Sequence, residues 1–205
     1  MKNAIIVPGH AILKDLEDVE ADSSWFLLGY QKGEPRFYIE HIRAAVEMAD
    51  GESAVILSGG YTRPGAPRSE AEGYRLVAGH FGWFGKSRVC AVTEEHARDS
   101  FENVLFGVAR FRQHFGRLPE HVTVCGWEFK RQRFDMHRAA IGWPAGRFRY
   151  IGVNDPDDLA LAEQHEALTR DLFAADPRGE APILAAKRRT RDPLGRNPPY
   201  DLSGL

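Results

Sequence analysis

Short apolar runs alternate with stretches of helical periodicity along most of the chain. Each run is rich in apolar and β-branched residues, which predicts a strand buried on both faces of a sheet. The predicted strands are residues 3–7, 54–57, 88–92, 122–125 and 148–152. The predicted helices, where apolar residues recur every three or four positions, are residues 37–50, 69–79, 99–116, 134–141 and 157–173. Because no hairpin signal joins the strands, the alternation predicts an α/β fold with a doubly wound, mainly parallel sheet of about five strands.

Two segments lack this alternation. Residues 13–34 are acidic and irregular, and we predict a loop with a short helix or flap there. The chain after Ala174 is rich in proline and arginine, which predicts an extended tail. We therefore expect one α/β domain over residues 1–175 and a Pro/Arg-rich C-terminal tail over residues 176–205 that packs on it.

A glycine turn follows the second predicted strand. Ser58-Gly59-Gly60 ends that strand, and glycine allows positive φ and a close approach of ligand to backbone. After Thr62 and Arg63, Ser69 opens a helix in the pattern Ser-x-x-Glu, a capping box that places free amides beside a helix N-terminus. Such a place binds anions, so we expect this loop and Glu70 to contact a polar ligand. Capping alone is the alternative explanation for Ser69.

Polar residues also follow the other predicted strands, and the carboxyl ends of parallel strands meet at one edge of a sheet. Gly9 and His10 end the first strand, where a histidine suits a general base, although a packed, hydrogen-bonded histidine is the alternative. Glu94 and Glu95 project in different directions, so at most one faces a cleft, and we take Glu95 as the second candidate for proton transfer. The remaining candidates for ligand contact at this edge are Asp99, Ser100, Asn103, Trp127 and Glu128.

Cations cluster at the start of the helix that follows the fourth strand. Lys130, Arg131 and Arg133 lie in its first turn, where positive charge opposes the helix dipole and favours an anionic partner nearby. The partner is either a ligand phosphate or carboxylate, or a neighbouring glutamate in a surface ion pair of small value. We expect Lys130 and Arg133 to bind the ligand.

Composition narrows the class of protein. The 205 residues carry a formal net charge of −2, which gives no general attraction to nucleic acid. No run of the sequence is apolar and long enough for a signal peptide or a membrane span, so we expect a cytoplasmic protein. Cys90 and Cys125 lie in strand-like runs without metal spacing, which indicates buried thiols, and no metal site is predicted. The P-loop, dinucleotide, nucleophile-elbow and zincin motifs are missing.

Several blocks of residues together resemble the domain-of-unknown-function 218 family, also called YdcF-like, and in particular its soluble branch found in fungi. They are Ser58-Gly59-Gly60, Ser69-Glu70-Ala71, Glu95 with Asp99-Ser100-Phe101-Glu102-Asn103, and Lys130-Arg131 with Arg133-Phe134 and His137. The resemblance implies a Rossmann-like three-layer α/β sandwich and a pocket built from these loops. It also implies a nucleoside-type ligand, with S-adenosylmethionine or a nucleotide as the candidate cofactor.

These observations lead to a functional hypothesis. We expect a small-molecule enzyme that binds a nucleotide-like or other anionic ligand at the carboxyl ends of the strands and carries out transfer or hydrolysis. His10 and Glu95 are the candidates for proton transfer. The alternatives are a non-catalytic nucleotide sensor using the same pocket, and an interaction module that acts through its basic tail.

Overall fold

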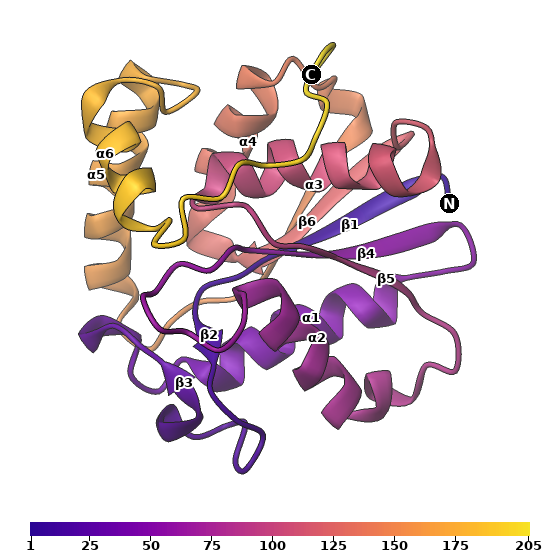
Figure 1. Cartoon of the computed structure of the whole chain (residues 1–205), viewed down its shortest axis with the longest axis vertical. Coiled ribbons are helices and arrows are strands. Elements are labelled where there is room, and N and C mark those ends of the chain that lie inside the picture. The colour runs from indigo at the N-terminus through magenta and orange to yellow at the C-terminus, as the bar shows by residue number, and fades with distance from the viewer.

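A five-stranded parallel sheet forms the centre of the computed structural model, which describes all 205 residues (Figure 1). The strand order is β5-β4-β1-β6-β7, and every neighbouring pair is parallel. The strands are β1 (Asn3–Pro8), β4 (Ser53–Ser58), β5 (Cys90–Glu94), β6 (His121–Trp127) and β7 (Phe148–Asn154). The order reverses at β1, since the chain builds outward to β5 and then returns to place β6 on the other side of β1. The predicted α/β sheet is confirmed.

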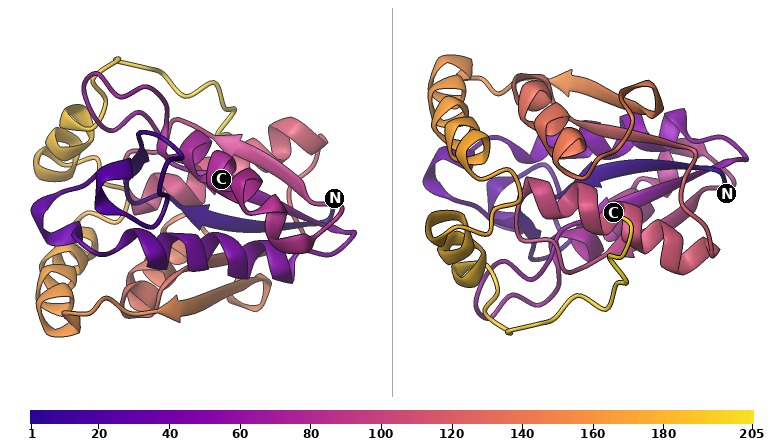
Figure 2. Two further views of the ribbon diagram at one scale, coloured as in Figure 1. Left: turned by 90° about the horizontal axis from the view of Figure 1, so that it is seen from below. Right: turned by 90° about the horizontal axis from the view of Figure 1, so that it is seen from above.

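Helices cover both faces of the sheet and make the fold a Rossmann-like three-layer sandwich (Figure 2). One face carries α1 (Pro35–Met48) and α2 (Glu70–His80), and the other carries α3 (Ser100–Phe115) and α4 (Arg131–Ala140). Alternate residues of β1 serve the two layers: Ile5 and Val7 belong to the core under α1 and α2, whereas Ala4 and Ile6 belong to the core under α3. This alternation explains why the strand is apolar throughout.

Both predicted N-caps are present. The side chain of Ser69 accepts a hydrogen bond from the Glu72 amide, and that of Asp99 accepts one from the Glu102 amide, each at 2.9 Å. Neither glutamate returns a bond to the amide of the cap residue: Glu72 pairs with Arg75, and Glu102 pairs with Arg98 and also accepts from the Arg98 backbone amide at 2.9 Å. Short-range sequence signals therefore set where α2 and α3 begin.

The irregular segment before α1 contains little regular structure, as expected. Two short strands, β2 (Ile12–Leu13) and β3 (Trp25–Phe26), pair antiparallel, with single 3-10 turns η1 (Asp22–Ser24) and η2 (Gly29–Gln31) beside them. Trp25 fixes the segment, since its ring is buried and its indole N–H donates to the carbonyl of Val19 at 2.9 Å.

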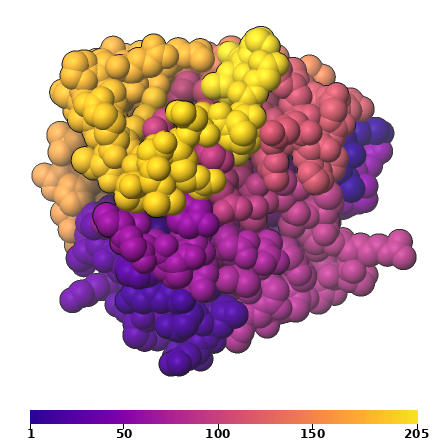
Figure 3. Space-filling model, viewed as in Figure 1, coloured from indigo at the N-terminus to yellow at the C-terminus, as the bar shows by residue number.

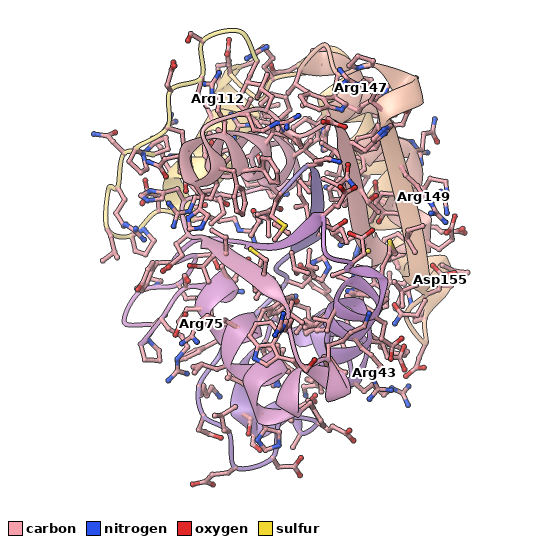
Figure 4. All side chains as sticks on the ribbon, turned by 90° about the vertical axis from the view of Figure 1, so that its right-hand side faces the viewer. Arg43, Arg75, Arg112, Arg147, Arg149 and Asp155 are labelled. Carbon is pink, nitrogen blue, oxygen red and sulfur yellow. The ribbon has the colours of Figure 1, made fainter.

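The C-terminal part differs from the predicted extended tail. After α5 (Leu159–Ala175), residues Pro182–Thr190 form a helix, α6, and only the chain beyond it is extended. Leu184 is buried, and Tyr200, Leu202 and Leu205 pack against the core under α3. The last residues lie on the surface of the domain (Figure 3). Arg112 of α3 holds them there by donating to the Ser203 carbonyl at 2.9 Å (Figure 4). No helix of the chain combines the length and the apolar composition needed to cross a membrane.

Candidate functional site

A cavity of about 330 Å³ opens at the carboxyl edge of the sheet, beside the point where strand order reverses between β1 and β6. We call it the edge cavity. Ligands of open α/β sheets bind at this place, and the volume suits a small molecule. Residues of the β1 end, the α3 and α4 starts, α5 and α6 line it. The predicted site residues that line it are Gly9, His10, Glu70, Asp99, Ser100, Asn103, Trp127, Lys130 and Arg133.

The sequence predicts that the glycine turn contacts a ligand, but the turn does not line the edge cavity. Its amides already have acceptors, because Gly59 N donates to the Glu94 carbonyl at 2.9 Å and Gly60 N to the Ala97 carbonyl at 2.7 Å. The first amides of α2 are likewise bound to the carbonyls of Gly60 and Gly59. A Cβ on Gly59 would lie 2.6 Å from Glu70 Oε2. The turn therefore surrounds the Glu70 carboxylate rather than a ligand.

Four other residues that the sequence predicts as ligand contacts either have structural roles or lie outside the edge cavity. Thr62 donates to Glu70 Oε1 at 2.5 Å. Ser69 is occupied as a cap. Glu128 is half-buried, lies outside the edge cavity and is paired with Arg131 at 2.5 Å. Arg63 lines a separate surface depression beside β3.

The sequence favours Glu95 as a candidate for proton transfer, but the acid that is buried after β5 is Glu94. Glu95 lies outside the edge cavity and accepts from Thr93 Oγ1 at 3.0 Å. Glu94 is fully buried, and burial raises the pKa of its carboxyl to about 7. Ser58 Oγ donates to it at 2.6 Å and Tyr200 Oη at 3.0 Å. Ser58 therefore supports a buried acid behind the cavity instead of contacting a ligand.

His10 lines the cavity with its side chain unpartnered. Its ring packs between Tyr38 and Trp127, with centroid distances of 5.3 and 6.1 Å, and its Nε2 is buried without a hydrogen bond. Burial lowers the pKa of His10 well below its usual value, and the nearby Lys130 lowers it further. The imidazole is therefore neutral at physiological pH and presents an apolar, weakly basic surface.

Positive charge in the edge cavity exceeds what the protein itself neutralises. Lys130 makes no hydrogen bond or ion pair, and burial, followed by the charge of Arg133, lowers the pKa of its ammonium to about 7. Lys187 of α6 lies at the rim and is also unpaired. Every carboxylate of the lining has a partner within the chain. Asp99, Glu166 and Glu70 form ion pairs with Arg188, Arg133 and Arg191, the last at 3.6 Å, whereas Glu34 accepts a hydrogen bond from the neutral Tyr38 hydroxyl.

Ser100 lies at the first position of α3 and is hydrogen-bonded on two sides. Its Oγ is 2.8 Å from His137 Nε2 and accepts from Arg133 Nη1 at 2.9 Å. His137 is fully buried among the rings of Phe101, Phe134 and Phe173. Sequence reasoning gave His137 no role, because a histidine on the apolar side of a helix resembles a core residue. The spacing of His137, four residues after Arg133, places both side chains on one face of the helix, and this is the sequence signal that could have linked His137 to the site.

The lining from α5 and α6 was also absent from the sequence-based site. It includes His165, Glu166, Lys187 and Arg191, which the sequence had placed in a last helix and a tail. These side chains face residues more than fifty positions earlier in the chain, such as Ser100 and His10. No local pattern could relate them.

The fold and this cavity define a Rossmann-like α/β protein with a cationic site at its carboxyl edge. No family model and no solved structure matches the chain. An uncharacterized protein of Saccharomyces cerevisiae, YOR238W, is 34% identical over an alignment of 123 residues that covers 53% of this chain and 40% of the yeast protein. The chain thus matches less than half of the length of that relative.

Proposed function

We propose that this protein is a small-molecule enzyme of the domain-of-unknown-function 218 type, which binds a nucleotide-like or other anionic ligand in the edge cavity. The observation that carries the proposal is Lys130, a partly buried ammonium that forms no ion pair in a cavity where Glu70, Asp99 and Glu166 are each paired with an arginine. An unpaired buried charge is costly, and a ligand anion would relieve that cost. Trp127, Phe129 and Tyr30 add aromatic surface on which a base could stack.

A ligand screen by thermal unfolding tests this function. Nucleotides, S-adenosyl compounds and sugar nucleotides are added to the purified chain, and a ligand present at a hundred times its dissociation constant should stabilise the fold by about 2.7 kcal/mol. Lys130→Met should abolish the stabilisation. Lys86→Met is the matched control, since Lys86 binds the Ala49 carbonyl at the opposite end of the sheet. Equal stabilisation of the wild type and Lys130→Met would contradict the proposal.

Sulfate provides a pH test that does not depend on knowing the natural ligand, because its charge is constant over the range used. The pKa of Lys130 is about 7. The ammonium is charged below that pH and loses its charge above it, so sulfate affinity should fall about tenfold between about pH 6 and about pH 8. The fall should be absent in Lys130→Met. A sulfate affinity that is independent of pH in the wild type would show that Lys130 does not bind the anion.

Turnover separates the enzyme from the alternative, a nucleotide sensor. That alternative draws support from His10, whose side chain has no orienting hydrogen bond. The interaction module has less support, because the basic residues of the tail are largely used inside the chain. Arg188 binds Asp99 at 2.6 Å, and Arg196 donates to the Glu95 carbonyl at 3.1 Å.

A further inference from the structure

The hydrogen bonds around Ser100 constrain where its hydroxyl proton goes. A guanidinium only donates, so Arg133 Nη1 occupies a lone pair of Ser100 Oγ. The Ser100 hydrogen is then free to point at His137 Nε2, 2.8 Å away. In that arrangement His137 carries its own hydrogen on Nδ1, which is buried and has no acceptor. This is the relation of a nucleophile to its base.

The access to the two side chains also differs in the way that a nucleophile and its base require. Ser100 is partly exposed and lines the edge cavity, whereas His137 is fully buried behind it and does not line the cavity. A ligand in the cavity would therefore meet the hydroxyl first, and His137 Nε2, 2.8 Å from Oγ, would reach only the ligand atoms bonded next to Oγ. No carboxylate bonds to Nδ1 of His137, so the two residues form a dyad.

Free amides lie next to the hydroxyl. Asp99 occupies the amides of Glu102 and Asn103 through its side chain and its carbonyl. The amides of Ser100 and Phe101 make no hydrogen bond within the chain. At the start of a helix of 16 residues they carry the positive end of the dipole, which stabilises negative charge that develops on an oxygen beside Ser100. The unpaired Lys130 in the same cavity is the independent sign that an anion belongs here.

We propose that Ser100 is a catalytic nucleophile with His137 as its base, and that the substrate is a small acyl ester carrying a negative charge. The proposal rests on the proposed function only for the use of the edge cavity and of Lys130, and it specifies the chemistry. Lys130 would pair with the charged end of the ester, and the amides of Ser100 and Phe101 would face its carbonyl oxygen.

The reaction needs only the ester and water. Ser100 Oγ forms a bond to the carbonyl carbon while its proton passes to His137 Nε2, and the carbonyl π pair moves onto the oxygen. The carbon–oxygen bond to the alcohol then breaks, and the alcohol oxygen takes the proton from His137. Water next gives a proton to His137 and attacks the acyl carbon. The bond to Ser100 breaks, Oγ regains the proton, and the carboxylic acid leaves.

A fluorophosphonate reporter tests the nucleophile without knowledge of the substrate. Attack by Ser100 Oγ forms an oxygen–phosphorus bond and expels fluoride, so the full chain should gain one adduct, mapped to Ser100 by peptide mass spectrometry. Ser100→Ala should abolish the adduct, and Ser87→Ala, at an exposed serine with no side-chain hydrogen bond, should keep it. A folded wild-type chain that gains no adduct, or an adduct that persists in Ser100→Ala, overturns the proposal.

The base is tested by rate and by pH. His137→Gln keeps a polar side chain but accepts no proton, and it should slow labelling by about a hundredfold or more. Burial lowers the pKa of His137 well below its usual value, so the wild-type rate should not fall as pH decreases through the range in which an ordinary histidine becomes charged. A purely structural His137 would give equal rates in the folded variant and the wild type, which contradicts its role as base.

Substrate charge is tested with two 4-nitrophenyl esters of similar acyl length, one ending in a carboxylate and one in a methyl group. We expect faster turnover of the charged ester, and Lys130→Met should remove that preference. The two proposals fail separately. Anion binding that depends on Lys130 without an adduct refutes the nucleophile alone, whereas an adduct without Lys130-dependent anion binding refutes the anionic site.

Discussion

Buried ionisable side chains at the carboxyl edge differ in whether the chain supplies their partners. Glu94 accepts hydrogen bonds from Ser58, Tyr200 and two backbone amides, so all of its polar neighbours come from the protein. Lys130 has none. The fully buried Glu94 joins β5 to the C-terminal segment, whereas the partly buried Lys130 has no anionic partner in the edge cavity.

Glu94→Gln should reduce the pH dependence of stability. The folded-state pKa of about 7 lies above the ordinary value of 4.5, so the protonated form is favoured by folding. The contribution of Glu94 to the free energy of unfolding is complete below the pKa of the unfolded state and is lost as pH rises through about 7. The loss amounts to about 3 kcal/mol. Urea unfolding at about pH 5 and about pH 8 measures it. Glu95→Gln, beside it but outside the buried network, should behave like the wild type, and an unchanged pH dependence in Glu94→Gln would refute the assignment.

Gly9→Ala should destabilise the fold. An added Cβ would lie 2.6 Å from Glu70 Cβ and 2.7 Å from its Oε2, so β1 or α2 must shift. We expect a loss of about 1–3 kcal/mol in the free energy of unfolding. Gly51→Ala is the control, because a Cβ there meets no atom within 4 Å. Equal stability of the two variants would show that β1 or α2 shifts at little cost to accommodate the added Cβ.

At the scale of elements, the start of α3 organises the site. Asp99 caps the helix and pairs with Arg188 of α6, Ser100 faces the cavity, and Glu102 binds Arg98. One helical turn therefore connects the sheet edge to the C-terminal helix. Helix α2 begins with an equivalent serine cap, but its first amides are closed by the glycine turn. The two helices have similar caps in sequence. They differ in whether their first amides are hydrogen-bonded, because different segments pack on them.

Asp99→Ala should cost more stability than Ser69→Ala. Loss of an N-cap costs about 1 kcal/mol, which is the expected effect at Ser69. At Asp99 the change also removes the shorter of the two ion pairs of Arg188, which is only 11% exposed, and leaves it the 3.5 Å contact to Glu102, so we expect a loss of about 2 kcal/mol or more. Chemical denaturation of both variants measures the difference. Similar losses would mean that the ion pair to α6 contributes little.

At the scale of the whole molecule, the cavity exists because α5 and α6 stand across the carboxyl edge of the sheet (Figure 1). Leu184 and Tyr200 pack on the core under α3, and Arg188 fixes α6 to Asp99. The C-terminal part is thus one wall of the site. It supplies Lys187 and Arg191, which are the last two cations in the chain to line the edge cavity.

Removal of residues 186–205 should abolish anion binding, since it removes that wall and two of its cations. The truncation also exposes core surface, so a folded control is required. Lys187→Met with Arg191→Met should reproduce the loss of sulfate binding while the thermal midpoint of the unliganded chain stays close to that of the wild type. If the double variant binds sulfate as the wild type does, α6 does not contribute to recognition.

The sequence by itself determined the order along the chain of the five sheet strands and of α1 to α5, the caps at Ser69 and Asp99, and the convergence of polar loops at one edge. These follow from periodicity and hydrogen bonds within a few residues, which a single chain displays directly. It also marked Lys130 and Arg133 as ligand contacts, because cations at the start of a helix favour an anionic partner nearby. Arg133 has that partner in Glu166, whereas Lys130 forms no ion pair.

Tertiary structure alone decided which side chains meet. Ser100 and His137 are 37 positions apart, and Tyr200 reaches Glu94 over 106. The choice of Glu94 over Glu95, the role of the glycine turn around Glu70, and the wall from α6 likewise depend on contacts between distant segments. Burial and partners, which set the charge state of each group, are properties of packing, and no local pattern contains them.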